Sequence, residues 1–360
     1  MWMQLTPHGA AEIKIMWGGD SGNWPLPPYT IPAETFRRQV ACVRKALDEM
    51  SGVYAEKNRV RTEEKLRQLA AEGHRMRHAL LDFPEREKIE EVLQQEFSSK
   101  DAILNILVGE ATCFPIGLCF NGDEKDCCYE DLIEKFWVTK MAVSYQLNSR
   151  PRWAYSEPFE RSDFCVISAV NRDVLAQAAS NFDDIQYGEF EAILEHPVGR
   201  AHNTDRLDEL VRKAQDSNTL LHFFCHCDDT KLHLSEGETL DPIDLSIKLD
   251  DLAGRNYNPQ NSTFNLLFLN ACETGLTHLD AGFLRLATKD GICGIVTTEA
   301  RVPTDFAARF GHDFLSRVIQ KGQSLGTAFS ALYHEHWPYS LLYSCYAERE
   351  FSIKQMDAVQ

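Results

Sequence analysis

The chain has 360 residues, of which 44% are apolar and 25% are charged, as is typical of a folded globular protein and not of a disordered or fibrous one. Lys and Arg number 37 against 54 Asp and Glu, so the formal net charge is −17 at pH 7. A surface this negative repels phosphate backbones and anionic membranes, and we therefore do not expect nucleic acid as the main ligand.

The sequence also argues against a membrane segment and against export. It contains no run of about 18 apolar residues, so no transmembrane helix is predicted. Its first residues lack the basic stretch and long apolar run of a signal peptide. Eleven cysteines without the spacings of a disulfide framework indicate reduced thiols. We expect a cytoplasmic protein with no membrane partner.

The first hundred residues predict one strand and then helices. Residues 12–17 alternate like a strand, and the Gly- and Pro-rich stretch after them is expected to be a loop. The apolar spacing is helical from about 33 to 81, with an interruption at Gly52, which predicts a helical hairpin. A third helix is expected after Pro84.

Two short apolar runs of strand length follow, at 102–109 and 140–147, with a loop and a helix between them. The polar stretch 148–163 contains two prolines, and we interpret it as the joint between an N-terminal and a C-terminal part.

The C-terminal part alternates between strands and helices. Strands are predicted at 164–170, 189–194, 219–225, 264–270, 292–298 and 339–347. Helices are predicted from 172 and at 204–216 (with Thr204 as N-cap), 241–253, 281–288, 304–321 and 324–336. Apolar strands that alternate with helices imply an α/β fold with a mostly parallel sheet covered by helices.

Two of these strands lead into side chains that can carry chemistry. His226 directly follows the strand 219–225, and Cys272 comes two residues after the strand 264–270. Open parallel sheets place their sites beyond the carboxyl ends of the strands. A thiolate can attack a carbonyl carbon while an imidazole moves the proton, which is nucleophilic acyl transfer. The alternative is that Cys272 is a buried packing residue and His226 a structural one.

Four segments in order carry a family resemblance: LLHFFCHC, LHLSEGETLDPIDL, LLFLNACETG and GICGIVTTEARVP. Together with the helical pair after them, they closely resemble the CHAT family of caspase-like cysteine peptidases, over about 164–350 and more weakly back to 100. The resemblance implies a caspase-like sheet sandwiched by helices over 101–360 and a helical or mixed region over 1–100. It also implies that Cys272 is the nucleophile, that His226 is the general acid/base, and that no cofactor is needed.

The sequence departs from the family directly after His226, where relatives have glycine and this chain has Cys227. By resemblance, the backbone N–H groups of Cys227 and Cys272 form the oxyanion hole. A positive φ would be strained for cysteine. Either the loop has an ordinary conformation here, or the oxyanion hole is imperfect until something reshapes it.

If the acidic loop after His226 borders the cleft, it would favour a basic residue before the scissile bond, as in several relatives, but the sequence does not name that residue. Eight acidic residues lie between His226 and Asp251, against two lysines. The candidate substrate-binding residues are Asp228, Asn270, Glu299 and Asp305. Their alternative roles are solvated loop groups or charges at a helix N-terminus.

The resemblance implies an endopeptidase that cleaves a specific protein partner as a triggered effector of prokaryotic antiviral defence. The sequence has neither a tetratricopeptide period nor a P-loop, so we expect the activating sensor to be another chain or the region 1–100. One alternative is a catalytically silent interaction or scaffold module, which the Cys227 departure favours. Another is a metal-binding regulator that uses the Cys/His-rich loops, but neighbouring side chains on a strand point to opposite faces, so no metal site is predicted.

Overall fold

The computed structural model describes residues 1–8, 11–18, 27–97, 103–108, 114–147, 159–160, 164–180, 182, 184–195, 199–215, 217–228, 230–253, 265–275, 282–289 and 291–354. The chain divides into two compact units, each taken by itself below. The first unit comprises Met1–Arg150 with Ser330–Ser344, and the second comprises Pro151–Phe329 with Cys345–Gln360.

The first unit contains a five-stranded sheet in the order β3-β2-β1-β4-β5. Its strands are β1 (Trp2–His8), β2 (Glu12–Gly18), β3 (Tyr29–Pro32), β4 (Ile103–Val108) and β5 (Ala142–Leu147). β1 runs antiparallel to β2 and parallel to β4. The predicted strands at 12–17, 102–109 and 140–147 are confirmed. The loop predicted after residue 17 is wrong over its last residues, which form β3 and pair with β2. β3 is an edge strand, where a proline at the strand end is tolerated.

A helical hairpin forms most of the rest of this unit, as predicted. It consists of α1 (Ala33–Gly52) and α2 (Arg59–Leu80), and α3 (Arg86–Phe97) follows. The Asn58 side chain caps α2 by accepting hydrogen bonds from the N–H groups of Val60 and Arg61, which satisfies two free donors of the first turn. Between β4 and β5 lie the single-turn helices α4 (Tyr129–Leu132) and α5 (Trp137–Lys140).

The boundary expected near residue 100 lies elsewhere. β4 and β5 belong to the first unit because β4 extends its sheet beside β1, with Met3 opposite Ile106. The division falls at 150, inside the stretch 148–163 interpreted as a joint, and that stretch lies outside the described residues except for β6 (Phe159–Glu160). Residues 330–344 return to the first unit, which the sequence did not indicate.

The second unit is built on a six-stranded sheet in the order β15-β14-β13-β9-β7-β8. The strands are β7 (Phe164–Val170), β8 (Gly199–Ala201), β9 (Asn218–Phe224), β13 (Asn265–Asn270), β14 (Ile292–Thr298) and β15 (Tyr343–Ala347). All four pairings from β8 to β14 are parallel. Every residue of β13 and β14 is buried, which explains why both strands are mostly apolar. The predicted α/β class is confirmed.

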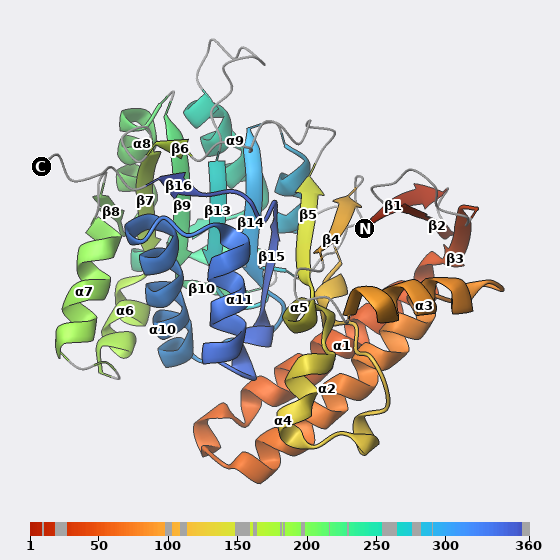
Figure 1. Cartoon of the computed structure of the whole chain (residues 1–360). Coiled ribbons are helices and arrows are strands. Elements are labelled where there is room, and N and C mark those ends of the chain that lie inside the picture. The colour runs from red at the N-terminus through yellow and green to blue at the C-terminus, as the bar shows by residue number, and fades with distance from the viewer. Residues whose placement is uncertain are drawn as a thin grey trace, which may run out of the picture. The chain divides into compact units, whose positions relative to one another are not determined.

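Helices cover both faces of this sheet (Figure 1). They are α6 (Arg172–Ala179), α7 (Asp184–Glu195), α8 (Thr204–Lys213), α9 (Pro242–Ala253), α10 (Thr304–Leu315) and α11 (Leu325–Glu335), and α11 belongs to this unit only up to Phe329. α6 and α7 both pack against α10, and α8 packs against α9. The strand predicted at 189–194 is wrong, since these residues lie within α7. The N-cap of α8 is Asn203 and not Thr204, because the Asn203 side chain accepts a hydrogen bond from the Arg206 N–H.

Two further predicted elements differ in type. A 3₁₀ helix, Phe283–Thr288, occupies the helix predicted at 281–288. The strand predicted at 339–347 begins with a 3₁₀ turn, Tyr339–Leu342, before β15. A small antiparallel sheet of β10 (His226–Asp228), β11 (Lys231–His233) and β12 (Thr239–Leu240) follows β9.

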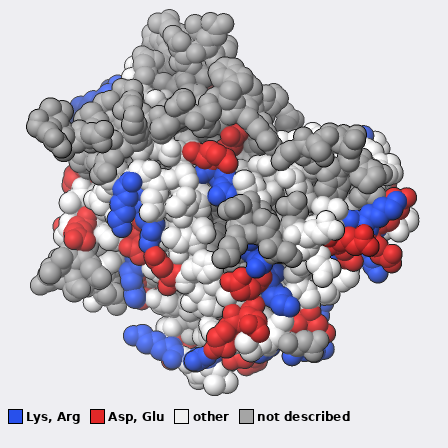
Figure 2. Space-filling model, in the orientation of Figure 1, with Lys and Arg blue, Asp and Glu red and all other residues white. Residues whose placement is uncertain are grey.

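Acidic and basic side chains are interspersed on the face drawn in Figure 2. Within the described ranges, no helix combines the length and the apolar character needed to cross a membrane.

Candidate active site

His226 and Cys272 lie at the ends of two neighbouring parallel strands. β9 and β13 pair over their whole lengths, and the last pair in register is Phe224 with Asn270. His226 and Cys272 each come two residues beyond that pair. Adjacent strands are about 4.8 Å apart, so the register carries both residues to the same edge of the sheet. His226 is exposed and Cys272 is half-buried.

The hairpin that begins with His226 is tied to the end of β7. β10 pairs with β11 so that His226 lies opposite His233. The Asn171 side-chain amide donates to the backbone carbonyls of His233 and Leu234, at 3.1 Å each. The Asn171 N–H donates to the Phe224 carbonyl at 2.9 Å. One asparagine therefore fixes both the end of β9 and the hairpin that follows it.

Cys227 lies within β10, opposite Leu232. It is not among the described non-glycine residues with positive φ. The ordinary loop conformation, the first of the two alternatives for this position, is the one found. A cysteine here therefore carries no left-handed strain.

The turn after β13, residues 271–275, is strained and firmly held. Glu273, directly after Cys272, has φ of 58°, a left-handed conformation that costs a non-glycine residue of order 1–3 kcal/mol. Its N–H donates to the Ala300 carbonyl at 3.2 Å, and the Gly275 N–H donates to the Thr298 carbonyl at 2.8 Å. The end of β14 and the residues directly after it thus hold the turn on both sides of Thr274. Such strain is frequent where a reactive side chain must be presented.

The surroundings of the Cys272 thiol favour its neutral form. Burial is the largest cause that raises its pKa; a backbone hydrogen bond at Val302 and the cation of Arg301 act against this, whereas the carboxylate of Glu273 adds to it. The thiol donates a hydrogen bond to the Val302 carbonyl, with Sγ and the oxygen 3.8 Å apart. Because the thiolate is the nucleophilic form, attack by Cys272 requires that the proton be removed.

Glu299 lies beneath the turn. Its side chain is fully buried, and its Oε1 accepts a hydrogen bond of 2.7 Å from the Tyr346 hydroxyl. A Cβ on Gly275 would lie 2.9 Å from the same oxygen, so the carboxylate packs directly against the last residue of the turn. Glu299 was expected in a substrate pocket, but here it is enclosed and supports the turn from within.

Replacing Tyr346 by phenylalanine is expected to lower the free energy of unfolding by about 1–3 kcal/mol, because the buried Glu299 carboxylate would lose the hydrogen bond that the Tyr346 hydroxyl donates. Urea unfolding of both proteins measures the change. Tyr187→Phe is the matched control, since it removes a Tyr–Glu hydrogen bond, to Glu191, at a position that is not buried. An equal loss in both variants would contradict the role given to the buried pair.

The other three predicted substrate residues differ in their surroundings. Asn270 is buried, and its side-chain amide donates to the Ala307 carbonyl on α10 at 2.9 Å. Asp305 lies in the first turn of α10 and pairs with Arg309 at 3.0 Å, four residues on. Asp228 is exposed on β10, and its Oδ1 lies 2.8 Å from Nε2 of His233. Only Asp228 shares both the exposure and the strand of His226.

Gly311 gives the Asn270 amide room against α10, because a Cβ at Gly311 would lie 2.7 Å from Nδ2. Gly311→Ala is therefore expected to break the Asn270–Ala307 bond and lower the unfolding free energy by about 1–3 kcal/mol. Gly188, on α7, has open space around it, and Gly188→Ala is expected to stabilise by about 0.4–1 kcal/mol. Chemical unfolding measures the change in unfolding free energy for each variant. Changes of opposite sign would support this packing, and changes of the same sign would contradict it.

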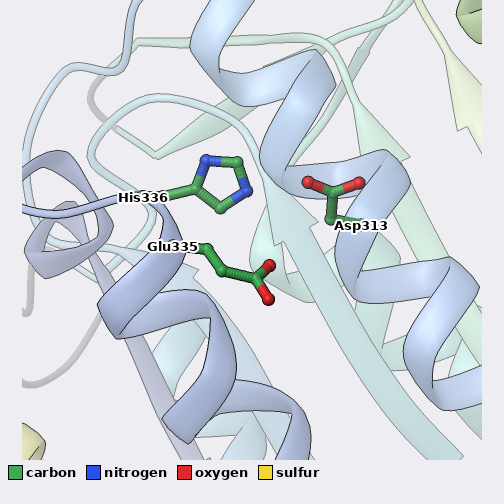
Figure 3. A group of neighbouring side chains, drawn as sticks. All are labelled: Asp313, Glu335 and His336. Carbon is green, nitrogen blue, oxygen red and sulfur yellow. The ribbon is translucent and has the colours of Figure 1, made fainter.

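A separate group of metal-ligating side chains contains Asp313, Glu335 and His336. Figure 3 shows Asp313 on α10 and the other two at the end of α11. Asp313 belongs to the second unit and already contacts His312, with 2.8 Å between the carboxylate and Nδ1. Glu335 and His336 belong to the first unit, and we assign no metal site to the group.

No family model matches the chain, and no curated protein matches it. The likeness to CHAT peptidases therefore depends on the four motifs and on what surrounds them.

Proposed function

We propose that the chain is a cysteine endopeptidase in which Cys272 is the nucleophile and His226 the general acid/base. The observation that carries this proposal is the parallel register of β9 and β13, which places an imidazole and a thiol at equivalent positions beyond adjacent strands. Buried hydrogen bonds hold the turn of Cys272, and Asn171 holds the hairpin of His226. Two reactive groups on rigid supports are what nucleophilic acyl transfer requires.

In the proposed reaction His226 accepts the Sγ proton, and the thiolate attacks the carbonyl carbon of the scissile peptide bond. The N–H groups of Cys227 and Cys272 donate to the oxyanion that forms. His226 then gives its proton to the leaving amine, which departs and leaves a thioester on Cys272. Water attacks this thioester with His226 as the base, releasing the carboxylic acid product and the free thiol.

We further propose that the peptidase is activated by a signal. The burial that raises the pKa of Cys272 favours the neutral thiol, so a rearrangement that brings the thiol toward His226 would raise its reactivity. The proposed trigger is a partner protein or the first unit, and the proposed setting is cytoplasmic antiviral defence against a protein substrate. Asp228 supports a basic residue before the cut, since it adds an exposed negative charge beside His226.

Covalent labelling tests the proposed function. An acyloxymethyl ketone with a lysine next to the reactive carbon is incubated with the full chain, and peptide mass spectrometry locates the label. We expect labelling at Cys272 that His226→Ala abolishes. Cys128→Ala, which removes an exposed thiol of the first unit, should leave the labelling of Cys272 unchanged. Equal labelling of Cys272 with and without His226 would contradict the dyad.

A silent scaffold on the same fold is the second candidate, and the raised pKa of Cys272 is the observation that favours it. It predicts that Cys272 stays unlabelled by the ketone with and without lysates that contain activators, although iodoacetamide alkylates it after unfolding.

A further inference from the structure

The first unit carries a pair of histidines on one face of α2, remote in sequence from the candidate dyad. His74 and His78 are four residues apart, so their side chains project from successive turns on the same side of the helix. Their Nε2 atoms are 2.9 Å apart, and the two rings meet edge to face with centroids separated by 4.4 Å. His78 is exposed and His74 is half-buried, so solvent reaches the pair.

We propose that His74 and His78 form a binding site for a divalent transition-metal ion of the Zn²⁺, Ni²⁺ or Cu²⁺ class. Imidazole nitrogen is a preferred ligand of these ions, with metal–nitrogen distances of about 2.0–2.1 Å. Two nitrogens that bind one ion at adjacent coordination positions are then about 3 Å apart, which the Nε2 atoms already are. Water fills the remaining positions.

Both histidines are on a helix that is held in place by its buried face. α2 runs from Arg59 to Leu80, and its buried face anchors it in the first unit through Leu69, Met76 and Leu80. Two histidines at this spacing on a folded helix are the ligand arrangement used in zinc enzymes with a His-x-x-x-His motif. Little ordering is needed when the ion binds, because only the ring rotamers have to be fixed.

Charged side chains lie around the pair. The groups that act on His78 are His74, Arg77, Arg86 and Glu90. Burial is the largest cause that lowers the pKa of His78, and the neighbouring His74 and Arg77 lower it further. Arg77 pairs with Glu90 at 3.2 Å, which offsets the repulsion that this guanidinium would exert on a cation.

Calorimetric titration of the untagged full chain with NiCl₂ at pH 7.5 tests the proposal. We expect one binding event that is lost in His74→Ala and in His78→Ala. His8→Ala, which removes an exposed histidine of β1 in the same unit, should keep it. Binding should weaken at least tenfold at pH 5.5, since protonated rings bind no metal.

Two results would overturn the site: no Ni²⁺ binding by the wild-type chain, or binding that both helix variants retain. Alanine favours helix and both side chains lie outside the core, so circular dichroism of the variants should match that of the wild type. A second measurement uses thermal unfolding, in which Zn²⁺ should raise the Tm of the wild type and of His8→Ala but not of the α2 variants.

Discussion

Replacing Cys272 by alanine is expected to lower the rate of peptide hydrolysis by the activated chain at least about 10³-fold, because no other group can form the thioester. His226→Ala should cause a loss of similar size, since no imidazole would then accept the Sγ proton or protonate the leaving amine. The double variant should be no slower than either single variant, because residues that act as one unit are not additive. Initial rates on a lysine-containing fluorogenic peptide, with an activating lysate, measure all three.

Cys227→Gly is the matched control for this series. It changes the residue next to His226 but keeps the backbone N–H that the mechanism uses. Because Cys227 is extended in β10, glycine offers it no new conformation that the fold needs. We expect its rate to stay within about tenfold of the wild type. If Cys272→Ala hydrolysed the peptide at the wild-type rate, Cys272 would be excluded as the nucleophile, whatever the rate of Cys227→Gly.

The unfolding free energy of the wild-type chain is expected to fall by about 2 kcal/mol more than that of His222→Leu when the pH falls from 6.5 to 5. His222 lies in the middle of β9, fully buried, with its ring stacked on Phe268 at 4.9 Å between centroids. Burial lowers its pKa from 6.5 to about 3. Between these two values the unfolded chain binds one more proton than the folded chain, so acid favours unfolding, while above pH 6.5 the full stability is present.

Urea unfolding at pH 7, 6 and 5 measures this difference. Both ring nitrogens of His222 are buried without a hydrogen-bond partner among the described residues, so a leucine should not lower the stability at pH 7 by more than about 1 kcal/mol. His8→Gln, at an exposed histidine, should follow the wild-type pH dependence. Parallel curves for the wild type and His222→Leu would show that His222 does not titrate as the burial requires.

The elements that the sequence predicted correctly are those with a strong local pattern. β9, β13 and β14 are mostly apolar runs of strand length, and α1 and α2 show clear helical spacing. The stretch 189–194 has apolar residues at spacings that fit both a helix and a strand. The structure shows that it is helical, as part of α7. β3 depends on pairing with β2, a contact that no local pattern specifies.

The positions of His226 and Cys272 could be predicted because each follows a recognisable strand, and parallel strands end at one edge. The support of the turn could not. Glu299 and Tyr346 are 47 residues apart, and neither stands in a pattern that distinguishes a buried hydrogen bond from two surface groups. The left-handed conformation at Glu273 was equally hidden, since glutamate gives no signal for positive φ.

The discontinuous makeup of the first unit has a consequence for synthesis on the ribosome. The first unit takes Ser330–Ser344 from late in the chain, and the second takes β15 residues from Cys345 onward. A nascent chain that has emerged only to residue 329 lacks part of each unit, although both dyad residues are already outside. The usual order of N-terminal domain first does not apply here. Both units reach their full set of residues only after the chain has emerged through Ser344 and β15, so the candidate site cannot be completely assembled before that point.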